Sequence, residues 1–149
     1  MSMSESVFFE RKAFYYETDG MRIAHHSNYI RWFEEARIWW LDTIGFGYDK
    51  MESDGVMIPV LSVNCKYHSP VRFNDKFRVC LMITEFNGVR FKVVYKLYNL
   101  TTGKLSAEGE SSHCFVSLDM KPIRTKTTHP EIYKVFKDAE GRKDWYENE

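Results

Sequence analysis

The sequence predicts an α+β domain in which one antiparallel β-sheet is wrapped around one long central helix. Residues 29–44 place apolar side chains at helical spacing, and four later segments alternate apolar and polar residues as strands do. Short turns join most of these segments, which favours antiparallel pairing. A chain of 149 residues has the size of one domain and can bury a core without disulfides or metals. We therefore expect a single domain over residues 1–149.

The first expected strand and the helix are both rich in aromatic residues. Residues 7–17 favour a strand, because aromatic side chains suit a pleated, half-buried surface. The apolar stripe of residues 29–44 consists of Tyr29, Phe33, Ala36, Trp40 and Ile44. Ser27 or Asn28 can cap the start of this helix, and Gly45 can end it in the left-handed conformation.

Four strands are expected after the helix, over residues 62–68, 76–83, 89–97 and 105–118. Asn87 and Gly88 predict a type I′ hairpin turn, since both tolerate a positive φ. Residues 101–103 predict a second turn, and Gly109 marks an expected β-bulge in the last strand. A short helix is expected over residues 130–136.

Charge and composition exclude several classes of protein. The chain has 21 Lys and Arg against 21 Asp and Glu, so it has no net charge to attract nucleic acid or an anionic membrane. Its longest uncharged stretch, residues 55–65, is too short to span a bilayer. Residues 1–12 lack the apolar run of a secretory signal. We therefore expect no nucleic-acid partner and no membrane partner.

The cysteines indicate a reducing compartment. Cys65, Cys80 and Cys114 are odd in number and widely spaced, which fits free thiols in a cytoplasmic protein. The sequence has no Cys-x-x-Cys and no histidine pair four residues apart, and the neighbours His113 and Cys114 point to opposite faces of a strand. We therefore expect no metal site.

Titratable residues gather in residues 17–28, between the first strand and the helix. Asp19, His25 and His26 place a carboxylate and two imidazoles just before a helix N-terminus. Unpaired backbone N–H groups at such a terminus suit an oxyanion, and the side chains supply a general base and an orienting group. The alternative is structural: Asp19 stabilises a turn, the histidines are loop residues, and Asn28 is only a cap.

Two other groups of charged residues allow a functional and a structural interpretation. Glu34 or Glu35 can act as a second catalytic carboxylate, or can favour the helix dipole and pair with nearby arginines. Lys121, Arg124 and Lys126 follow the last strand and can meet a phosphate or form a solvated connection. No phosphate-binding loop and no nucleophile elbow is present.

Residues 14–46, FYYETDGMRIAHHSNYIRWFEEARIWWLDTIGF, resemble the signature of the 4-hydroxybenzoyl-CoA thioesterase-like acyl-CoA thioesterases. The matching positions are Asp19, His26, Asn28, Tyr29 and Phe33-Glu34-Glu35-Ala36-Arg37. A later passage, with Tyr67, Pro70, Arg72 and Asp75, is also similar to that family. The resemblance implies the hotdog fold, whose order of elements agrees with the order read from periodicity.

The resemblance also implies an activity and a site. It implies hydrolysis of an acyl thioester to a free acid and coenzyme A, with Asp19 as general base or nucleophile. The backbone N–H of His26 then polarises the thioester carbonyl and its imidazole assists, while Asn28 and Tyr29 shape the pocket floor and Arg72 binds substrate. No metal or prosthetic group is implied, because water is the co-substrate and coenzyme A leaves as product.

The family pattern further implies a homodimer or a dimer of dimers, with active sites at the interface, since a lone sheet leaves an edge strand exposed. Two alternative functions stay open: a hotdog hydroxyacyl dehydratase that takes its acid from Glu34 or Glu35, and a non-enzymatic acyl-binding module. The chain departs from the family at Arg22, where glycine is usual. We expect a re-routed loop there and a cation near the pocket, because glycine takes backbone angles that arginine resists.

Overall fold

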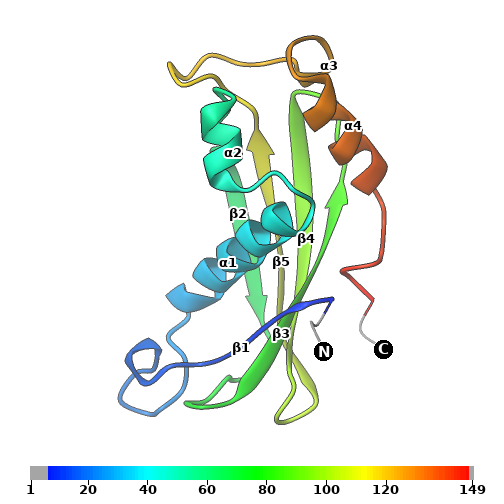
Figure 1. The fold of residues 1–149 in the computed structure, drawn as a ribbon. Helices are drawn as coiled ribbons and strands as arrows, with labels where there is room; N and C mark the ends of the chain where they lie inside the picture. The colour runs from blue at the N-terminus through cyan, green and yellow to red at the C-terminus, as the bar shows by residue number, and fades with distance from the viewer. Residues whose placement is uncertain (1–6, 148–149) are drawn as a thin grey trace.

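One five-stranded antiparallel sheet and one long helix organise the molecule, as the sequence predicts. The computed structural model describes residues 7–147. The strands are β1 Phe9–Lys12, β2 Val60–Tyr67, β3 Lys76–Thr84, β4 Arg90–Asn99 and β5 Lys104–Cys114. They lie in the order β1-β3-β4-β5-β2, and helix α1, Ser27–Thr43, crosses one face of this sheet (Figure 1).

The remaining elements are short. They are the 3₁₀ helix η1 Tyr15–Glu17 and the helices α2 Tyr48–Ser53, α3 Thr125–Thr128 and α4 Pro130–Ala139. The terminal helix is confirmed and is longer than predicted, whereas α2 was not predicted. The strand expected over residues 7–17 is wrong in its second half, because the Glu17 carboxylate accepts a hydrogen bond from the Phe14 N–H (2.8 Å) and closes a 3₁₀ turn instead.

Helix α1 ends as predicted but begins differently. Gly45 has a φ of +89°, and its N–H donates to the Asp42 carbonyl (3.1 Å) while the Phe46 N–H donates to the Leu41 carbonyl (2.9 Å). This is the Schellman arrangement, which satisfies carbonyls at the helix end. The expected cap by Ser27 or Asn28 is wrong: His26 holds the N-cap position, and its own side chain makes no capping hydrogen bond.

Two glycine predictions in the sheet also need correction. Gly88 has a φ of +89° but Asn87 does not have a positive φ, so the β3–β4 loop is not a type I′ turn. Gly109 lies in regular register opposite Tyr95, and a Cβ there would come within 2.2 Å of the Asn64 carbonyl oxygen. Gly109 therefore permits a close approach between strands, and the register shift in the β4–β5 pair lies elsewhere, between Leu97 and Tyr98.

The two edges of the sheet differ. Along β3, the outer edge is covered first by β1 and then by the C-terminal segment, where the Leu81 N–H donates to the Trp145 carbonyl (2.7 Å) and the Gly141 N–H to the Ile83 carbonyl (2.8 Å). At the other edge, β2 pairs with β5 and has no second partner strand among the described residues. The sheet therefore presents one open edge.

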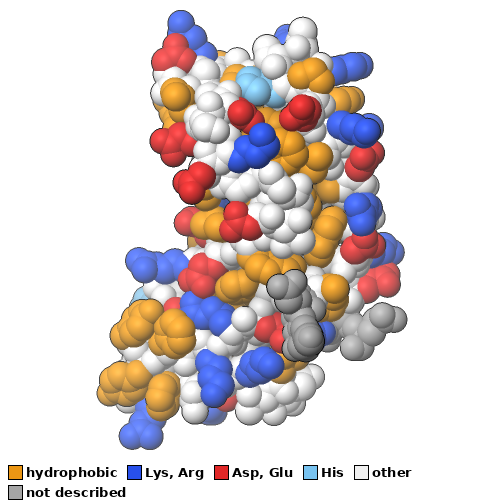
Figure 2. Space-filling view, in the orientation of Figure 1, with side chains coloured by type: hydrophobic (Ala, Val, Ile, Leu, Met, Phe, Trp, Pro, Cys, Tyr) orange, Lys and Arg blue, Asp and Glu red, His pale blue; other side chains and the backbone are white. Residues whose placement is uncertain are grey.

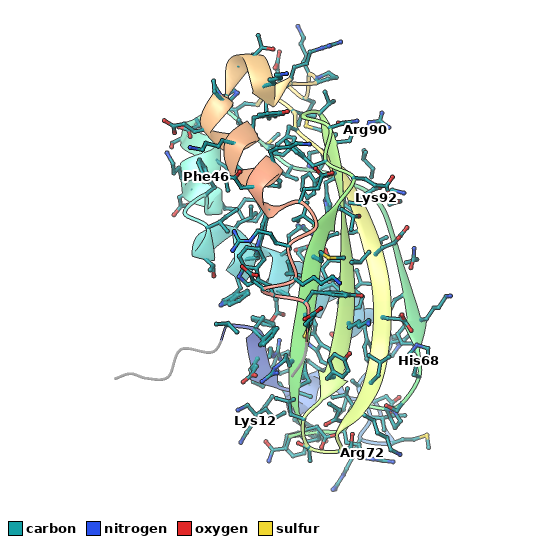
Figure 3. The ribbon with its side chains drawn as sticks, turned by 90° about the vertical axis from the view of Figure 1, so that its right-hand side faces the viewer. Lys12, Phe46, His68, Arg72, Arg90 and Lys92 are labelled. Carbon is teal, nitrogen blue, oxygen red and sulfur yellow. The ribbon has the colours of Figure 1, made fainter. Side chains whose placement is uncertain are left out.

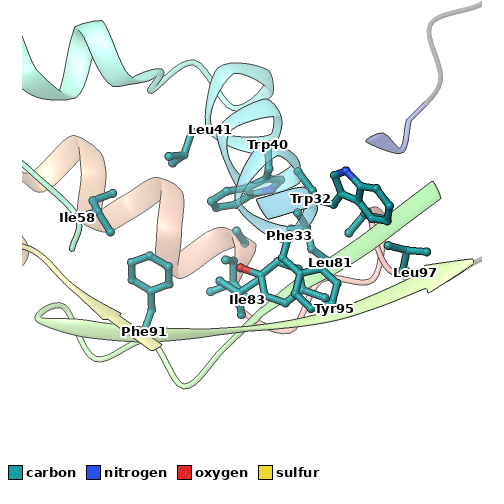
Figure 4. Close-up of a cluster of buried hydrophobic side chains, with 14 of the residues drawn as sticks. Trp32, Phe33, Trp40, Leu41, Ile58, Leu81, Ile83, Phe91, Tyr95 and Leu97 are labelled. Atoms are coloured by element: carbon teal, nitrogen blue, oxygen red, sulfur yellow. The ribbon is translucent and has the colours of Figure 1, made fainter. Parts of the chain in front are cut away.

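The core lies between α1 and the sheet (Figure 4). Phe33 stacks on Tyr95 with ring centroids 4.5 Å apart, and Trp32 packs on Phe77 at 4.3 Å. The Tyr95 hydroxyl shares a hydrogen bond with Ser111 Oγ (2.7 Å), which in turn contacts His113 Nε2 (2.7 Å). Burying polar groups requires such partners.

None of the helices within residues 7–147 is long and apolar enough to cross a membrane.

Candidate active site

The loop that carries Asp19 is a short hairpin. Thr18 and Ala24 form an antiparallel bridge, the Asp19 N–H donates to the Ile23 carbonyl (2.9 Å), and the Arg22 N–H donates to the Asp19 carbonyl (3.0 Å). Asp19 Oδ1 accepts the Met21 N–H (2.8 Å), whereas no donor within residues 7–147 reaches Oδ2. The exposed Asp19 carboxylate thus helps to form the turn and keeps one oxygen open to a ligand.

Arg22 adopts the conformation that a glycine would supply. Its φ is +63°, in the left-handed region, where an L-residue is destabilised by about 1–2 kcal/mol. Two backbone hydrogen bonds hold it there, because its N–H donates to Asp19 and its carbonyl accepts the Phe73 N–H (3.0 Å). Arg22 therefore takes the left-handed angle itself, although an arginine is strained there.

Glu17 anchors this loop to the helix, a role that the sequence did not reveal. The Glu17 side chain is 6% exposed, and its carboxylate accepts hydrogen bonds from the Arg11 guanidinium and from Trp32 Nε1 (2.9 Å). Its backbone carbonyl accepts the Asn28 side-chain amide (2.8 Å) and the His25 N–H (2.9 Å). A Glu just before a polar turn carries no periodic signal that would mark it as buried.

The two histidines at the start of α1 play different parts. Their rings stack with centroids 4.2 Å apart. His25 Nδ1 accepts the Ser27 N–H (3.2 Å) and lies 2.9 Å from Ser27 Oγ, so the ring is tied to the first residue of α1. The His26 carbonyl accepts the Tyr67 hydroxyl (3.1 Å), whereas nothing in residues 7–147 accepts a hydrogen bond from the His26 N–H. This N–H is available to a ligand at the helix N-terminus.

Two pockets flank the segment that leads into α1. One, of about 450 Å³, is lined by Tyr16, Glu17, Thr18, Asp19, His25, Ser27, Asn28, Arg31 and Glu35. The other, of about 260 Å³, is lined by Ile23, Ala24, His26, Tyr29, Tyr67, His68, Ser69 and Pro70. The structure therefore groups Asp19 with Asn28 and groups His26 with Tyr29. Within one chain, Asp19 and His26 line separate pockets.

Two tyrosines line the second pocket as neutral groups. Burial raises the pKa of Tyr29 above its usual range, and burial together with the nearby Cys65 raises the pKa of Tyr67 to about 12. The Tyr29 hydroxyl also accepts the Val71 N–H (3.3 Å). Both phenols keep their protons at neutral pH. The Tyr67 hydroxyl donates its proton to the His26 carbonyl (3.1 Å), whereas the Tyr29 hydroxyl can donate to a ligand.

Arg72 lies beside this loop but lines neither pocket. Ile23 and Arg72 form an antiparallel bridge, and the Arg72 N–H donates to Asp75 Oδ2 (2.9 Å). The Arg72 side chain is exposed and lies at the end of the sheet where Lys12 also lies (Figure 3). Its backbone is thus part of the scaffold of the site, and its side chain is exposed to solvent.

The remaining charged candidates lie on the surface and have ordinary partners or none. Glu35 forms an ion pair with Arg11 (2.7 Å), whereas no cation within residues 7–147 pairs with Glu34. Lys121 lies 3.7 Å from Asp119, and Lys126 lies 5.8 Å from the Tyr133 ring centroid, so these lysines have surface partners. No three His, Cys, Asp or Glu residues within the described chain form a group that could hold a metal ion.

Comparison with known proteins identifies the family. A model described as the thioesterase-like superfamily matches residues 15–137. The chain belongs to the thioesterase-like superfamily. A Bacillus subtilis relative named "Putative acyl-CoA thioesterase YneP" is 34% identical over 84% of this chain and 91% of its own. An Aquifex aeolicus "Putative esterase" is also 34% identical, over 87% of this chain and 97% of its own.

Solved structures place this superfamily member among hotdog-fold thioesterases. The Staphylococcus aureus DHNA-CoA thioesterase superposes with a TM-score of 0.83 at 30% identity, covering 88% of both chains. The family model, which matches residues 15–137, spans the hairpin with Asp19, helix α1 and strands β2 to β5. The resemblance seen in residues 14–46 is therefore confirmed, and so is the predicted fold.

Proposed function

We propose that this protein hydrolyses acyl thioesters of coenzyme A to a carboxylic acid and coenzyme A. The observation that carries the proposal is the placement of an open carboxylate, Asp19, and an unengaged backbone N–H, that of His26, on the same short segment before α1. Family membership and the thioesterase names of the relatives support hydrolysis over dehydration or simple binding.

The proposed reaction uses Asp19 to generate the attacking group. In the general-base route, Asp19 takes a proton from water as the water oxygen bonds to the thioester carbon. The tetrahedral oxyanion then collapses, the C–S bond breaks, and the thiolate takes the proton back from Asp19. In the nucleophilic route, the carboxylate itself attacks and water hydrolyses the resulting anhydride. Both routes consume one water molecule and need no metal or prosthetic group.

The oxyanion is proposed to lie at the N-terminus of α1. The His26 N–H and the positive end of the helix dipole would stabilise the developing charge, and one such donor typically contributes about 10²–10³ in rate. The His26 imidazole would assist from the same side. Asn28 and Tyr29 are assigned to the pocket floor, where the Asn28 amide also donates to the Glu17 carbonyl (2.8 Å). Arg72 is assigned to substrate binding.

The proposed active unit is a homodimer or a dimer of dimers. The open edge strand β2 exposes Val60, Leu61, Val63 and Tyr67, and exposed apolar edges favour pairing with another strand. Asp19 and His26 line separate pockets within one chain, which fits a site that a second copy completes. We also assign the protein to the cytoplasm, in keeping with its three free cysteines.

The test is a panel of short, medium, long and aromatic acyl-CoAs scored for release of free thiol. Hydrolysis of at least one well above the rate without enzyme is expected. The Glu34→Gln variant should retain that activity. A hydroxyacyl dehydratase would instead leave the thioester bond intact and release no thiol from any acyl-CoA. Background rates with every acyl-CoA, and with acyl-carrier-protein thioesters as well, would refute the proposed function.

A further inference from the structure

His25 shares a pocket with Asp19, although the resemblance to known thioesterases assigns no role to it. The pocket of about 450 Å³ that Asp19 lines is lined by His25 as well, whereas His26 lines the other pocket. Within one chain, the imidazole that accompanies the proposed catalytic carboxylate is therefore that of His25.

The hydrogen bonds of His25 determine which of its ring nitrogens carries the proton. His25 Nδ1 accepts the Ser27 N–H (3.2 Å) and lies 2.9 Å from Ser27 Oγ. A backbone N–H can only donate, so Nδ1 is unprotonated and the proton of the neutral ring is on Nε2. No acceptor within residues 7–147 forms a hydrogen bond with Nε2. His25 thus holds a donor that has no partner in its own chain.

This donor is held in place at the N-terminus of α1. The backbone N–H of His25 donates to the carbonyl of the buried Glu17 (2.9 Å), and the ring is tied to Ser27 on its other side. The His25 ring also stacks on the His26 ring, with centroids 4.2 Å apart. The unengaged backbone N–H of His26 and the His25 Nε2–H therefore come from consecutive residues, and neither needs a large rearrangement to meet a ligand.

The pocket of Asp19 and His25 can be reached from the solvent. Figure 2 shows hydrophobic side chains gathered at the end of the molecule where Figure 1 draws the loop between β1 and α1. Tyr16, which lines this pocket, is 80% exposed, and Met21 on the same loop is 76% exposed. An acyl thioester therefore has direct access to the His25 donor.

We propose that His25 Nε2–H is a second hydrogen-bond donor to the oxyanion, beside the backbone N–H of His26. This assignment rests on the proposed thioesterase function and adds a catalytic residue to it. When an oxygen of water or of Asp19 bonds to the thioester carbon, the carbonyl electron pair moves to the carbonyl oxygen. That oxyanion is bonded to the same carbon as the attacking oxygen, so a donor in the pocket of Asp19 is close to it. The proton stays on Nε2, because the ring donates a hydrogen bond and transfers no proton.

The test uses two substitutions that separate the two nitrogens of His25. His25→Gln places an amide nitrogen as many bonds from Cβ as Nε2 is, so it keeps a donor towards the pocket. His25→Asn places an amide oxygen as many bonds from Cβ as Nδ1 is, so it keeps only the acceptor for the Ser27 N–H.

The expected result is a loss of kcat that depends on the donor. Thiol release on the best acyl-CoA should show kcat about 10²–10³-fold lower in His25→Asn, the effect of removing one oxyanion donor, and within about tenfold of the wild type in His25→Gln. KM should change little in both variants, because the oxyanion forms only after the substrate is bound. The Tm of each variant checks its folding.

A role confined to holding the start of α1 predicts the opposite order. If His25 served only to accept the Ser27 N–H, His25→Asn would be the more active of the two variants. That order, equal kcat values in the two variants, or a wild-type kcat in His25→Asn would each overturn the proposal. Nitrogen NMR chemical shifts of the wild-type imidazole give a measurement that needs no change in activity: the proton of the neutral ring is expected on Nε2, and a proton on Nδ1 would also overturn it.

His129 offers a matched control, because its Nε2 already bonds the Asp54 carbonyl at the end of α2 (3.0 Å) and it lines a different pocket. His129→Asn and His129→Gln should both leave kcat unchanged. A wild type that releases no thiol from any acyl-CoA would refute the proposed function, and the role of His25 with it. An active wild type whose kcat survives in His25→Asn would refute the role of His25 alone.

Discussion

Asp19 is the residue on which the proposed chemistry depends, and the structure makes its substitution informative. Asp19→Asn keeps an Oδ1 that can accept the Met21 N–H, so the turn and the Tm should be preserved. It removes the basic oxygen, so kcat should fall about 10²–10⁴-fold. Thiol release on the best acyl-CoA measures this. If the variant kept half of the wild-type kcat or more, Asp19 would be a turn residue only. His26→Ala should lower kcat less than Asp19→Asn does, because the substitution removes the imidazole but leaves the backbone N–H in place.

His113 should make folding sensitive to acid. Burial, and then the Arg37 guanidinium, lower the pKa of His113 to about 3 from the ordinary value of 6.5. The unfolded chain therefore binds a proton between these pH values that the folded chain does not, so this contribution to stability is complete above pH 6.5 and is lost progressively towards pH 3. His113→Gln should show a smaller fall in Tm between pH 6.5 and pH 4.5 than the wild type. Parallel Tm curves would contradict this.

At the scale of elements, the end of α1 depends on one backbone conformation. Gly45→Ala places a Cβ at a φ of +89° and should lower stability by about 1–2 kcal/mol, a fall of several degrees in Tm. Gly20→Ala is the matched control, since Gly20 lacks a positive φ and a Cβ there meets nothing within 4 Å. Thermal unfolding followed by circular dichroism compares the two. An equal fall in Tm for the two variants would show that the positive φ of Gly45 does not contribute specifically to stability.

The elements that could be predicted from the sequence are those with a periodic pattern. Helix α1 and strands β2 to β5 were predicted because their apolar residues repeat at 3.6 or 2 residues. Helix α2, Tyr48–Ser53, and the 3₁₀ turn η1, Tyr15–Glu17, were missed, since both are shorter than two helical turns and depend on tertiary contacts. The turn at η1 forms because Glu17 is buried against Arg11 and Trp32, partners that sequence spacing does not bring together.

In the candidate site, too, local sequence pattern predicts some features, and contacts between distant segments determine the others. Its location before α1 was predicted, because titratable residues there precede a helix N-terminus. Its internal arrangement was not: Asp19 and His26 face different pockets, and Arg22 takes a glycine-like angle. Hairpin register and the buried anchor Glu17 determine these details, and both are set by contacts between segments rather than by local pattern.

At the scale of the whole molecule, the two sheet edges are treated in opposite ways. The edge of β3 is covered by β1 and by the segment that contains Trp145, so the chain itself pairs its hydrogen-bonding groups. The edge of β2 is left open, and its strand is mostly exposed along its whole length. A sheet that protects one edge with its own chain and leaves the other apolar is built to pair at the second.

We therefore expect the protein to sediment as a dimer or larger assembly at micromolar concentration. Val63→Lys places a charge in the middle of the open edge, where two copies would bring like charges together, and should shift the protein towards monomer with a similar Tm for the folded chain. Thr127→Lys adds the same charge on an exposed residue of α3, outside the sheet, and should leave the sedimentation coefficient unchanged. Thiol release should fall with dissociation in Val63→Lys, because Asp19 and His26 line separate pockets in one chain. A wild-type protein that sediments as a stable monomer and is fully active would contradict both the dimer and the shared site.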